Sequence, residues 1–310
     1  MACPLKLNSP PPRLAPADLT AGQRRLPRAL GLLLALSGFV GTWAFFAAFI
    51  IFLGNLPRPA HTWMTPSVDV GAAQGAWPYV GNLLLIVLFG LQHSGMARPG
   101  FKRILAIYIP PALERAVYVQ AACLAGFLLI VAWQPIPIVL WEVSYPPLKI
   151  ALWIGFAAGW LLLLMAALSI DILELLGVKQ AWAWYTGRVP APLTLKTNWL
   201  YAWISHPMYV GVFLGLWMAP FMTVGHALLA AALTTYMIVG KRLEEHDLEA
   251  RFGAPYRRWK WTLAHTGTAA HQVGLDAYGV QLRAALQPMT TDGPSDEIVK
   301  AWMGLRRADP

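Results

Sequence analysis

Three polar clusters interrupt an otherwise apolar chain, and they hold the residue types best suited to chemistry. The first is Gln92-His93-Ser94 with Arg98, the second opens with His206-Pro207, and the third, 241–253, carries the carboxylates Glu244, Glu245, Asp247 and Glu249. Ionisable groups at the ends of apolar runs are costly to keep there, so they are functional candidates by default. Each cluster also has a structural interpretation, as a helix cap at the interface, a lipid-phosphate anchor or a solvated helix end.

The second cluster has the spacing of a helix start that can hold a ligand. Pro207 suits a first helical turn, where its missing N–H is not needed. His206 and Tyr209 are three residues apart and therefore share one helix face. Unpaired backbone N–H groups at such a start can receive a carboxylate, such as that of a methionine-like ligand.

The stretch after this helix start predicts a helical hairpin. From His206 to Gly240 the chain is apolar, and it is punctuated by Pro220 and by Thr223-Val224-Gly225. This length is enough for two shorter helices joined by a tight turn. The two ends of such a hairpin meet at one membrane face, so we expect His206 and Glu244 to be neighbours across one pocket.

The composition places the protein in a bilayer. Of the 310 residues, 57% are apolar and 13% are charged, and the mean hydropathy is +0.50. So little polar surface cannot cover a water-soluble globule. The formal net charge of +9 comes from basic residues in loops, so no nucleic acid partner is expected. The cysteines Cys3 and Cys123 define neither a disulfide framework nor a metal site.

Apolar runs of roughly 20 residues, the length that spans a bilayer, predict the transmembrane helices. Four runs are clear and the hairpin adds two more helices: 30–53, 77–92, 112–133, 148–168 and 206–240. Lys and Arg are frequent in every second loop, which by the positive-inside rule puts the N- and C-termini in the cytoplasm. The predicted fold class is all-α, a polytopic integral membrane protein with about six transmembrane helices. Its expected parts are a disordered cytoplasmic lead (1–29), a transmembrane domain (30–260) and a cytoplasmic tail (261–310).

The second and third clusters together resemble a known signature. His206-Pro207-Met208-Tyr209-Val210-Gly211, a spacer of one hairpin, and then Glu244-Glu245, Phe252-Gly253 and Tyr256 are similar to the C-terminal signature of the isoprenylcysteine carboxyl methyltransferase superfamily. Upstream motifs resemble the methanethiol S-methyltransferase branch of that superfamily: Gln92-His93-Ser94, Pro110-Pro111 with Glu114-Arg115 and Tyr118, Trp133-Gln134-Pro135, and Gly177 with Gln180. Together the motifs cover residues 76–259.

This resemblance implies a cytoplasmic pocket for S-adenosyl-L-methionine, built by the last two helices and the loop before them. The cofactor-binding residues carried over by position are Gln180, Leu193, Thr194, Leu195, Tyr201, His206, Pro207, Tyr209 and Glu244. The catalytic candidates are His93, Glu114 and Arg115. Either His93 or Glu114 could accept the proton of a thiol, because the thiolate is the competent nucleophile. No metal is implied.

The implied activity is S-adenosylmethionine-dependent methylation of a small thiol, with methanethiol converted to dimethyl sulfide. One alternative is an isoprenylcysteine carboxyl or lipid methyltransferase, whose lipophilic acceptor enters from the bilayer. Another is a non-enzymatic NnrU-like membrane component or a small transporter. The presence of both His206 and Glu244 favours an enzyme, and the inverted repeats with broken helices that are typical of transporters are not apparent in the sequence.

Overall fold

The computed structural model describes residues 27–56, 67–71, 75–191, 194–197 and 199–265. The chain forms two compact units. The first comprises the described residues up to Tyr201 together with His206–Arg242. The second comprises Ala202–Ser205 and the described residues from Leu243 onward, and it contains the helix α11 (Ala254–His265).

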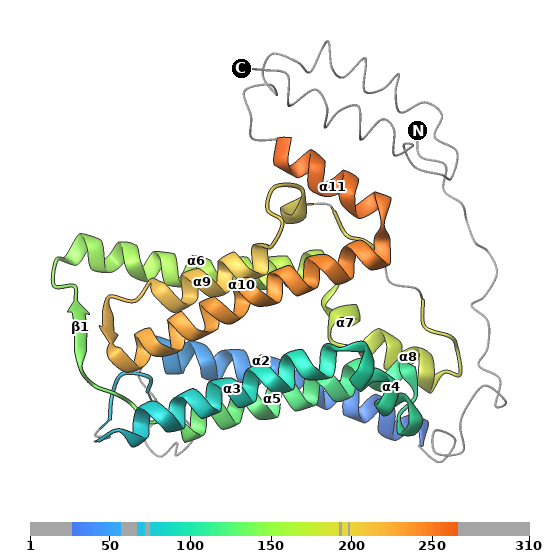
Figure 1. Ribbon diagram of the computed structural model, residues 1–310, viewed down its shortest axis with the longest axis horizontal. Helices are drawn as coiled ribbons and strands as arrows, with labels where there is room; N and C mark the ends of the chain where they lie inside the picture. The colour runs from blue at the N-terminus through green and yellow to red at the C-terminus, as the bar shows by residue number, and fades with distance from the viewer. Residues whose placement is uncertain (1–26, 57–66, 72–74, 192–193, 198, 266–310) are drawn as a thin grey trace, which may run out of the picture. The chain divides into compact units, whose positions relative to one another are not determined.

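The first unit is built of long apolar helices (Figure 1). Among the described residues, five helices have the length and composition to cross a membrane: α2 (Arg28–Gly54), α3 (Trp77–Ala97), α5 (Glu114–Ala132, entered through the 3-10 turn η2, Pro111–Leu113), α6 (Pro146–Ser169) and α10 (Val224–Phe252). A shorter apolar helix, α9 (Pro207–Trp217), precedes α10. Many large side chains on these helices are exposed, for example Leu83, Leu124 and Ile154 at 50, 69 and 63%. Such exposure is favourable against lipid rather than water, so this is a multi-pass membrane protein.

The predicted helical membrane fold is confirmed, and its four clear runs coincide with α2, α3, α5 and α6. The predicted hairpin is present, but its helices are unequal, with 11 residues in α9 and 29 in α10. The charged stretch after Gly240 is rich in Lys, Arg, Glu and Leu, which are strong helix formers, so α10 continues well past the apolar run. Its end, from Leu243, belongs to the second unit.

Between α6 and α9 the chain forms short elements rather than a long helix. They are α7 (Ile172–Leu175), α8 (Val178–Tyr185) and the 3-10 turn η3 (Trp199–Ala202). Helix α8 packs against α2, where Ala181 and Trp184 join a buried cluster with Ala35. The loop that the sequence singled out for ligand binding is therefore partly helical and anchored to the first membrane helix.

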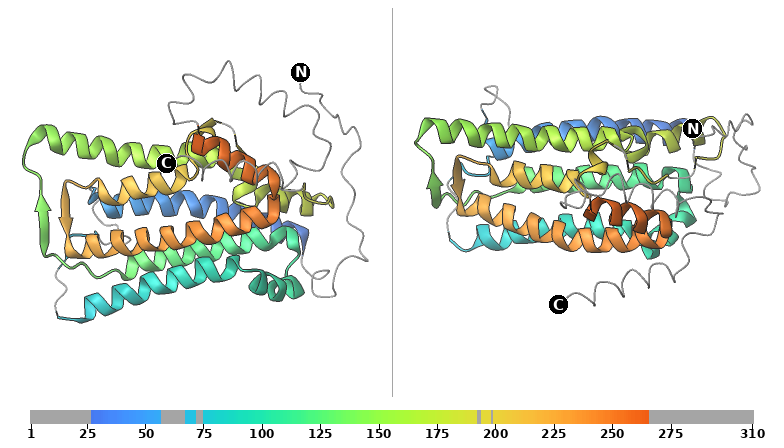
Figure 2. Two further views of the ribbon diagram at one scale, coloured as in Figure 1. Left: turned by 45° about the horizontal axis from the view of Figure 1, so that its top comes forward. Right: turned by 90° about the horizontal axis from the view of Figure 1, so that it is seen from above.

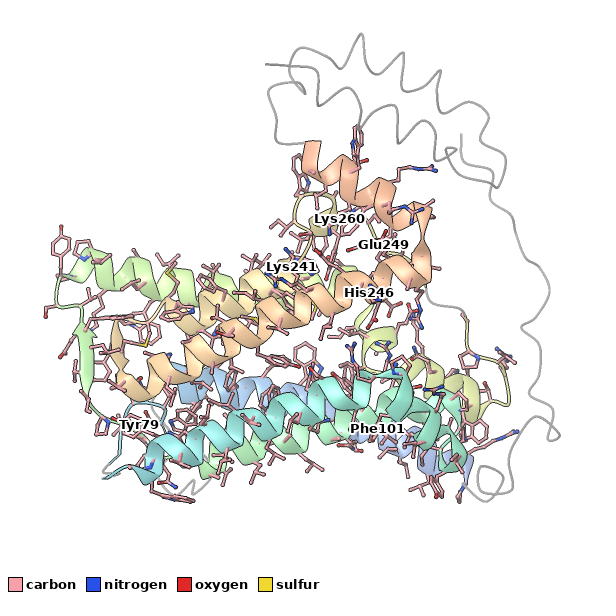
Figure 3. The ribbon with its side chains drawn as sticks, in the orientation of Figure 1. Tyr79, Phe101, Lys241, His246, Glu249 and Lys260 are labelled. Carbon is pink, nitrogen blue, oxygen red and sulfur yellow. The ribbon has the colours of Figure 1, made fainter. Side chains whose placement is uncertain are left out.

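Helices α3 and α4 (Pro99–Tyr108) mark the two surfaces of the membrane. Figure 3 labels Tyr79 near the start of α3 and Phe101 beyond its end, and both aromatic side chains are exposed. Exposed aromatic residues at two levels are typical of the membrane interfaces. The 21 residues of α3 rise about 31 Å, close to the ~30 Å of a hydrocarbon core. Helix α4 combines exposed apolar residues, Phe101, Ile104 and Ile107, with the adjacent basic pair Lys102-Arg103, as in a helix that lies in the membrane surface.

Glycines let α6 and α9 approach until their backbones touch. A Cβ added to Gly159 of α6 would lie 2.7 Å from the carbonyl oxygen of Gly211 in α9. One added to Gly211 would lie 2.6 Å from the carbonyl oxygen of Gly159. At Gly215, an added Cβ would lie 2.7 Å from the indole of Trp160. Small residues of this kind are typical of membrane helix pairs, where close packing replaces the hydrophobic effect as the source of association.

A two-stranded antiparallel sheet joins the segment before α6 to the turn between α9 and α10. Strand β1 (Val139–Glu142) pairs with β2 (Phe221–Thr223), and the two arrows lie side by side in both views of Figure 2. Flanking bonds extend the pairing, from Val143 N–H to the Pro220 carbonyl and from Val224 N–H to the Ile138 carbonyl. The sequence interpretation placed only a loop and a tight turn here, because neither segment alone has the length of a typical strand.

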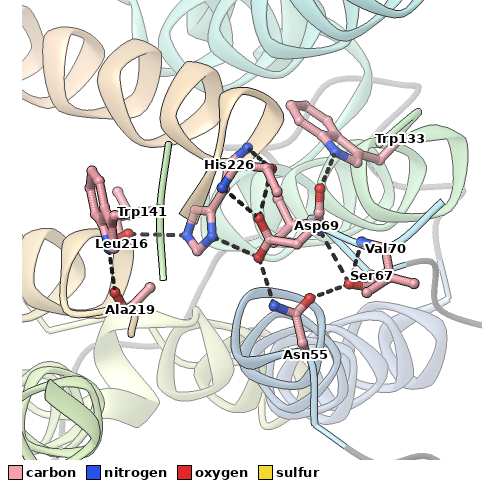
Figure 4. Close-up of polar contacts among 11 residues, drawn as sticks. Asn55, Ser67, Asp69, Val70, Trp133, Trp141, Leu216, Ala219 and His226 are labelled. Atoms are coloured by element: carbon pink, nitrogen blue, oxygen red, sulfur yellow. Dashed lines mark hydrogen bonds and ion pairs between the residues drawn. The ribbon is translucent and has the colours of Figure 1, made fainter. Parts of the chain in front are cut away.

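A buried polar network lies at the same turn (Figure 4). Asp69, in the segment between α2 and α3, faces His226 in the first turn of α10, and both side chains have 0% exposure. Its Oδ1 accepts from the backbone N–H and the hydroxyl of Thr223 at 3.1 and 2.7 Å. Its Oδ2 accepts from Asn55 Nδ2 at 2.6 Å and lies 3.1 Å from His226 Nδ1. One carboxylate thus joins the end of α2 to the turn that links α9 and α10.

The geometry of this network shows how the histidine is protonated. His226 Nε2 lies 3.1 Å from the carbonyl oxygen of Leu216, which can only accept, so Nε2 carries a proton. When Asp69 is ionised, Nδ1 donates as well and the ring is a cation. Burial opposes the charge on Asp69, but its bonds to His226, Asn55 and Thr223 and the positive charge of His226 outweigh burial. The pKa of Asp69 is therefore held below its ordinary value.

We expect Asp69→Asn to lower the thermal unfolding midpoint in detergent, because it leaves a buried histidine without its counter-charge, at a cost of about 3 kcal/mol. Glu142→Gln is the matched control, since it makes the same carboxylate-to-amide change at an exposed residue of β1. Because the folded pKa of Asp69 is depressed, its contribution is complete above about pH 4 and is lost as the pH falls further. The difference between wild type and variant should shrink over that range. Equal midpoints at pH 7 would contradict this assignment.

Candidate functional site

His93 and Ser94, in the last turns of α3, face Tyr236 of α10. The hydroxyl oxygen of Tyr236 lies 2.9 Å from His93 Nδ1 and 2.8 Å from Ser94 Oγ. The imidazole also packs against Phe89 and Tyr118, with ring centroids 5.6 and 5.3 Å away. Within the described part of the chain, no hydrogen bond is made to His93 Nε2. One ring nitrogen is therefore held by the protein, and the other is left for a proton or a bound molecule.

The other two predicted catalytic residues begin α5 and have structural partners. Glu114 Oε1 lies 2.8 Å from Lys102 Nζ of α4, and Arg115 Nη1 donates to the Leu175 carbonyl of α7 at 3.1 Å. Tyr118, one turn after Glu114, contacts His93. The structure therefore brings all three predicted residues to one end of the first unit. Glu114 and Arg115 thus have partners within the protein, whereas no hydrogen bond to His93 Nε2 is made by the described residues.

Gly177 makes the turn between α7 and α8 possible. Its φ is +84°, and a Cβ added there would lie 3.0 Å from the Ala116 nitrogen, so any side chain would be strained. Asp171 caps α7 by accepting from the Glu174 N–H at 3.2 Å, and it pairs with Lys179. The hydrogen bond from Lys179 is the main reason why the pKa of Asp171 is below its ordinary value. These contacts set the orientation of α8.

Gln180 presents an unpartnered buried atom on α8. Its Nε2 donates to the Glu174 carbonyl at 3.1 Å, whereas its buried Oε1 has no partner among the described residues. Trp184 lies one turn further along the same helix face. Its indole Nε1 is also buried and has no hydrogen-bond partner among the described residues. A buried polar atom without a partner costs about 1–3 kcal/mol. Both atoms are buried without a partner among the described residues, and the cofactor contact expected of Gln180 stays a prediction.

The start of α9 has the predicted form. Pro207 is its first residue and His206 its N-cap. The ring of Tyr209 stacks on that of His206, with centroids 5.2 Å apart and planes 10° apart. A Cβ added to Gly240 of α10 would lie 4.0 Å from the Tyr209 hydroxyl. Since Gly240 is one turn beyond Tyr236, α10 brings the His206 pair and the His93 cluster within one turn of each other.

The loop before α9 is described only in part. Thr194 is exposed, and Leu195 and Tyr201 are half-buried. Leu193 lies outside the described residues. The cofactor contacts expected of these four residues stay predictions.

Glu244 belongs to the second unit, on the exposed part of α10. Because His206 belongs to the first unit, the expected proximity of His206 and Glu244 stays a prediction. Within the second unit, burial and then the charges of Glu245, Glu244 and Glu249 raise the pKa of Tyr256 to about 12. Three carboxylates of α10 thus lie near Tyr256 of α11.

Two ion pairs hold α11 against the end of α10. Lys260 Nζ lies 2.7 Å from Glu245 Oε2, and Arg257 Nη1 lies 3.5 Å from Glu249 Oε1. The carboxylate that the sequence signature points to, Glu244, lies on the same part of α10.

Sequence reasoning missed Tyr236, Asp69 and His226. Each is a polar side chain in or beside an apolar run, and a buried phenol or carboxylate needs a partner. The sequence could therefore have indicated that each of these side chains has a polar partner. The partners could not be named, because His93 and Tyr236 are 143 residues apart and Asp69 and His226 are 157 apart.

No family model and no solved structure matches the chain. Curated relatives do match. A methanethiol S-methyltransferase from Pseudomonas sp. is 42% identical over 195 residues, which is 62% of this chain and 75% of the relative. Methanethiol S-methyltransferase 2 of Bradyrhizobium diazoefficiens is 36% identical over 236 residues, covering 74 and 87% of the two chains. Nurim of Bos taurus is 33% identical over 180 residues, covering 55 and 68%.

Proposed function

This chain belongs to the methanethiol S-methyltransferase family, and we propose that it methylates a small thiol, converting methanethiol to dimethyl sulfide. The observation that carries the proposal is the sequence identity of 42 and 36% to relatives of that name, over 62 and 74% of this chain. The position of His93 supports it, because one ring nitrogen is held by Tyr236 while the other is open to an acceptor. A small apolar thiol reaches such a site from the bilayer.

For the methyl donor we propose S-adenosyl-L-methionine, which supplies a methyl group on a positively charged sulfur. The buried Gln180 Oε1 fits a donor group of such a molecule. The stacked rings of His206 and Tyr209 offer a flat face for an adenine. Tyr209 N–H already donates to the His206 carbonyl, so a carboxylate at this helix start would be received by the Met208 N–H. Glu244 supplies the charge opposite to a sulfonium.

Further contacts to the donor are assigned to the loop and helix start that the family signature covers. These residues are Leu193, Thr194, Leu195, Tyr201 and Pro207. Their roles are positional, since they would shape the wall of the pocket rather than exchange protons.

His93 is the proposed proton acceptor. As the thiol sulfur bonds to the methyl carbon, the old carbon–sulfur bond breaks with its electron pair left on the donor sulfur. The thiol proton moves to His93 Nε2, so atoms and charge balance. The rings of Phe89 and Tyr118 exclude water around the imidazole, and positioning then supplies much of the acceleration. Arg115 would hold α7 against α5 through the Leu175 carbonyl, which orients the segment that leads to Gln180.

Purified protein supplied with S-adenosylmethionine and methanethiol should release dimethyl sulfide, measured by gas chromatography of the headspace. Heat-denatured protein is the blank for the slow uncatalysed reaction. Folded protein that makes no dimethyl sulfide but methylates a prenylcysteine analogue would replace the thiol proposal with the lipid methyltransferase alternative.

Glu244→Gln should weaken adenosylmethionine binding roughly 3- to 10-fold in calorimetry, because a carboxylate holds a cation better than an amide does. Glu249→Gln is the matched control: it makes the same change on the same helix, about 140° further around, at a residue paired with Arg257. Equal losses in the two variants would mean that only the overall charge of this part of α10 matters.

The active site is proposed to face the cytoplasm, with both termini on that side. The alternation of basic loops supports this orientation. A reporter inserted after Trp141, in β1 between α5 and α6, should read as external, and one inserted after Leu195, between α8 and α9, as cytoplasmic. If the second reporter also reads as external, a cytoplasmic donor site is wrong.

A further inference from the structure

We propose that Tyr236 is a positioning residue for this reaction: its hydroxyl oxygen accepts from His93 Nδ1–H while its own proton goes to Ser94. This arrangement leaves Nε2 without a proton and able to take the one that the thiol releases. The inference rests on the proposed function and deepens it. Tyr236 lies in an apolar stretch of α10, outside every motif of the sequence signature.

The distances require a directed chain of hydrogen bonds. The Tyr236 oxygen is 2.9 Å from His93 Nδ1 and 2.8 Å from Ser94 Oγ, but a phenol has one proton to donate. If that proton goes to Ser94, Nδ1 must carry the ring proton and Nε2 has a lone pair. If it goes to Nδ1 instead, Nε2 carries the ring proton and cannot act as a base. Ser94 matters because it gives the phenol a second acceptor.

Packing holds the three groups in place. The Tyr236 ring lies against α3 at Gly90, where an added Cβ would be 3.5 Å from two of its carbons. Gly90 is one turn before Ser94 on the same helix face. The His93 ring is confined by Phe89 and Tyr118 on other sides. The imidazole therefore keeps Nδ1 toward Tyr236, and Nε2 is the nitrogen that an acceptor meets.

The same arrangement serves the product state. When Nε2 takes the thiol proton, the ring becomes a cation and Nδ1–H still donates to the Tyr236 oxygen. No other proton has to move during methyl transfer, and the ring proton is later released to water. A base oriented by a third group is a recurring arrangement in enzymes that activate a nucleophile.

Tyr236→Phe removes the hydroxyl and keeps the ring. We expect kcat for methanethiol to fall roughly 10- to 100-fold, because a general base loses its orientation. The KM for methanethiol and the calorimetric affinity for adenosylmethionine should change less than about twofold, since positioning acts on the chemical step and not on ground-state binding. Thr235→Val is the control, since among the described residues this neighbouring hydroxyl bonds only its own helix, at the Ala231 carbonyl. A loss shared equally by KM, donor affinity and stability would reduce Tyr236 to a packing role.

A more acidic acceptor separates proton transfer from packing. With 2,2,2-trifluoroethanethiol, much of which is already ionised near neutral pH, the loss in Tyr236→Phe should shrink several-fold, because a thiolate needs no base. Ser94→Ala should show the same dependence on the thiol, with a smaller loss. The same loss for both thiols would overturn the proposal while leaving the methyltransferase assignment intact.

The ring proton can also be read without turnover. Nitrogen-15 shifts in histidine-labelled protein distinguish the two neutral tautomers, and His93→Gln identifies the signal among the seven histidines. We expect the Nδ1–H tautomer in the wild type and a change of tautomer populations in Tyr236→Phe. An Nε2–H tautomer in the wild type would overturn the proposal, whether or not methanethiol is the acceptor.

Discussion

A fully buried polar group cannot turn to water, so each one must find its partner in the protein. Asp69 is the residue on which this constraint falls most heavily, because its carboxylate is fully buried beside His226. It is satisfied only when Asn55 at the end of α2, Thr223 in the turn between α9 and α10, and His226 at the start of α10 all contribute donors. The carboxylate is therefore stable only in the assembled unit, and its burial selects one arrangement of these helices.

Helix α10 links the buried Asp69–His226 pair to the contact between Tyr236 and His93. His226 lies in its first turn and Tyr236 ten residues later, about 15 Å along the axis. The ion pair at one end and the contact between Tyr236 and His93 at the other fix both the height and the rotation of α10. Where α6 meets α9 the backbones are already in contact, so α9 has little freedom to shift. The site thus inherits its geometry from contacts outside it.

The parts of the fold that depend on local composition were predictable, and the parts that depend on distant partners were not. Long apolar runs, together with Pro207 at the start of the hairpin, were enough to place the helices. The β1–β2 pairing and the His226–Asp69 pair join segments far apart in the chain, and no local pattern encodes them. His93 was identified because an ionisable side chain at the end of an apolar run is energetically unfavourable and therefore a functional candidate. Tyr236 was overlooked because a tyrosine in a membrane helix is an ordinary interfacial residue until its neighbour is known.

The junction between α3 and the surface helix α4 also determines how deep His93 lies in the bilayer. Arg98 separates the two helices, and His93 lies five residues earlier, about 7 Å deeper in the bilayer. At that level the solvent is hydrocarbon close to the headgroups. An uncharged volatile thiol concentrates there by partitioning, whereas a thiol with a permanent charge stays in the water. With His93 as the proposed proton acceptor, the depth of its imidazole ranks methyl acceptors by their oil–water partition coefficient before any side chain touches them.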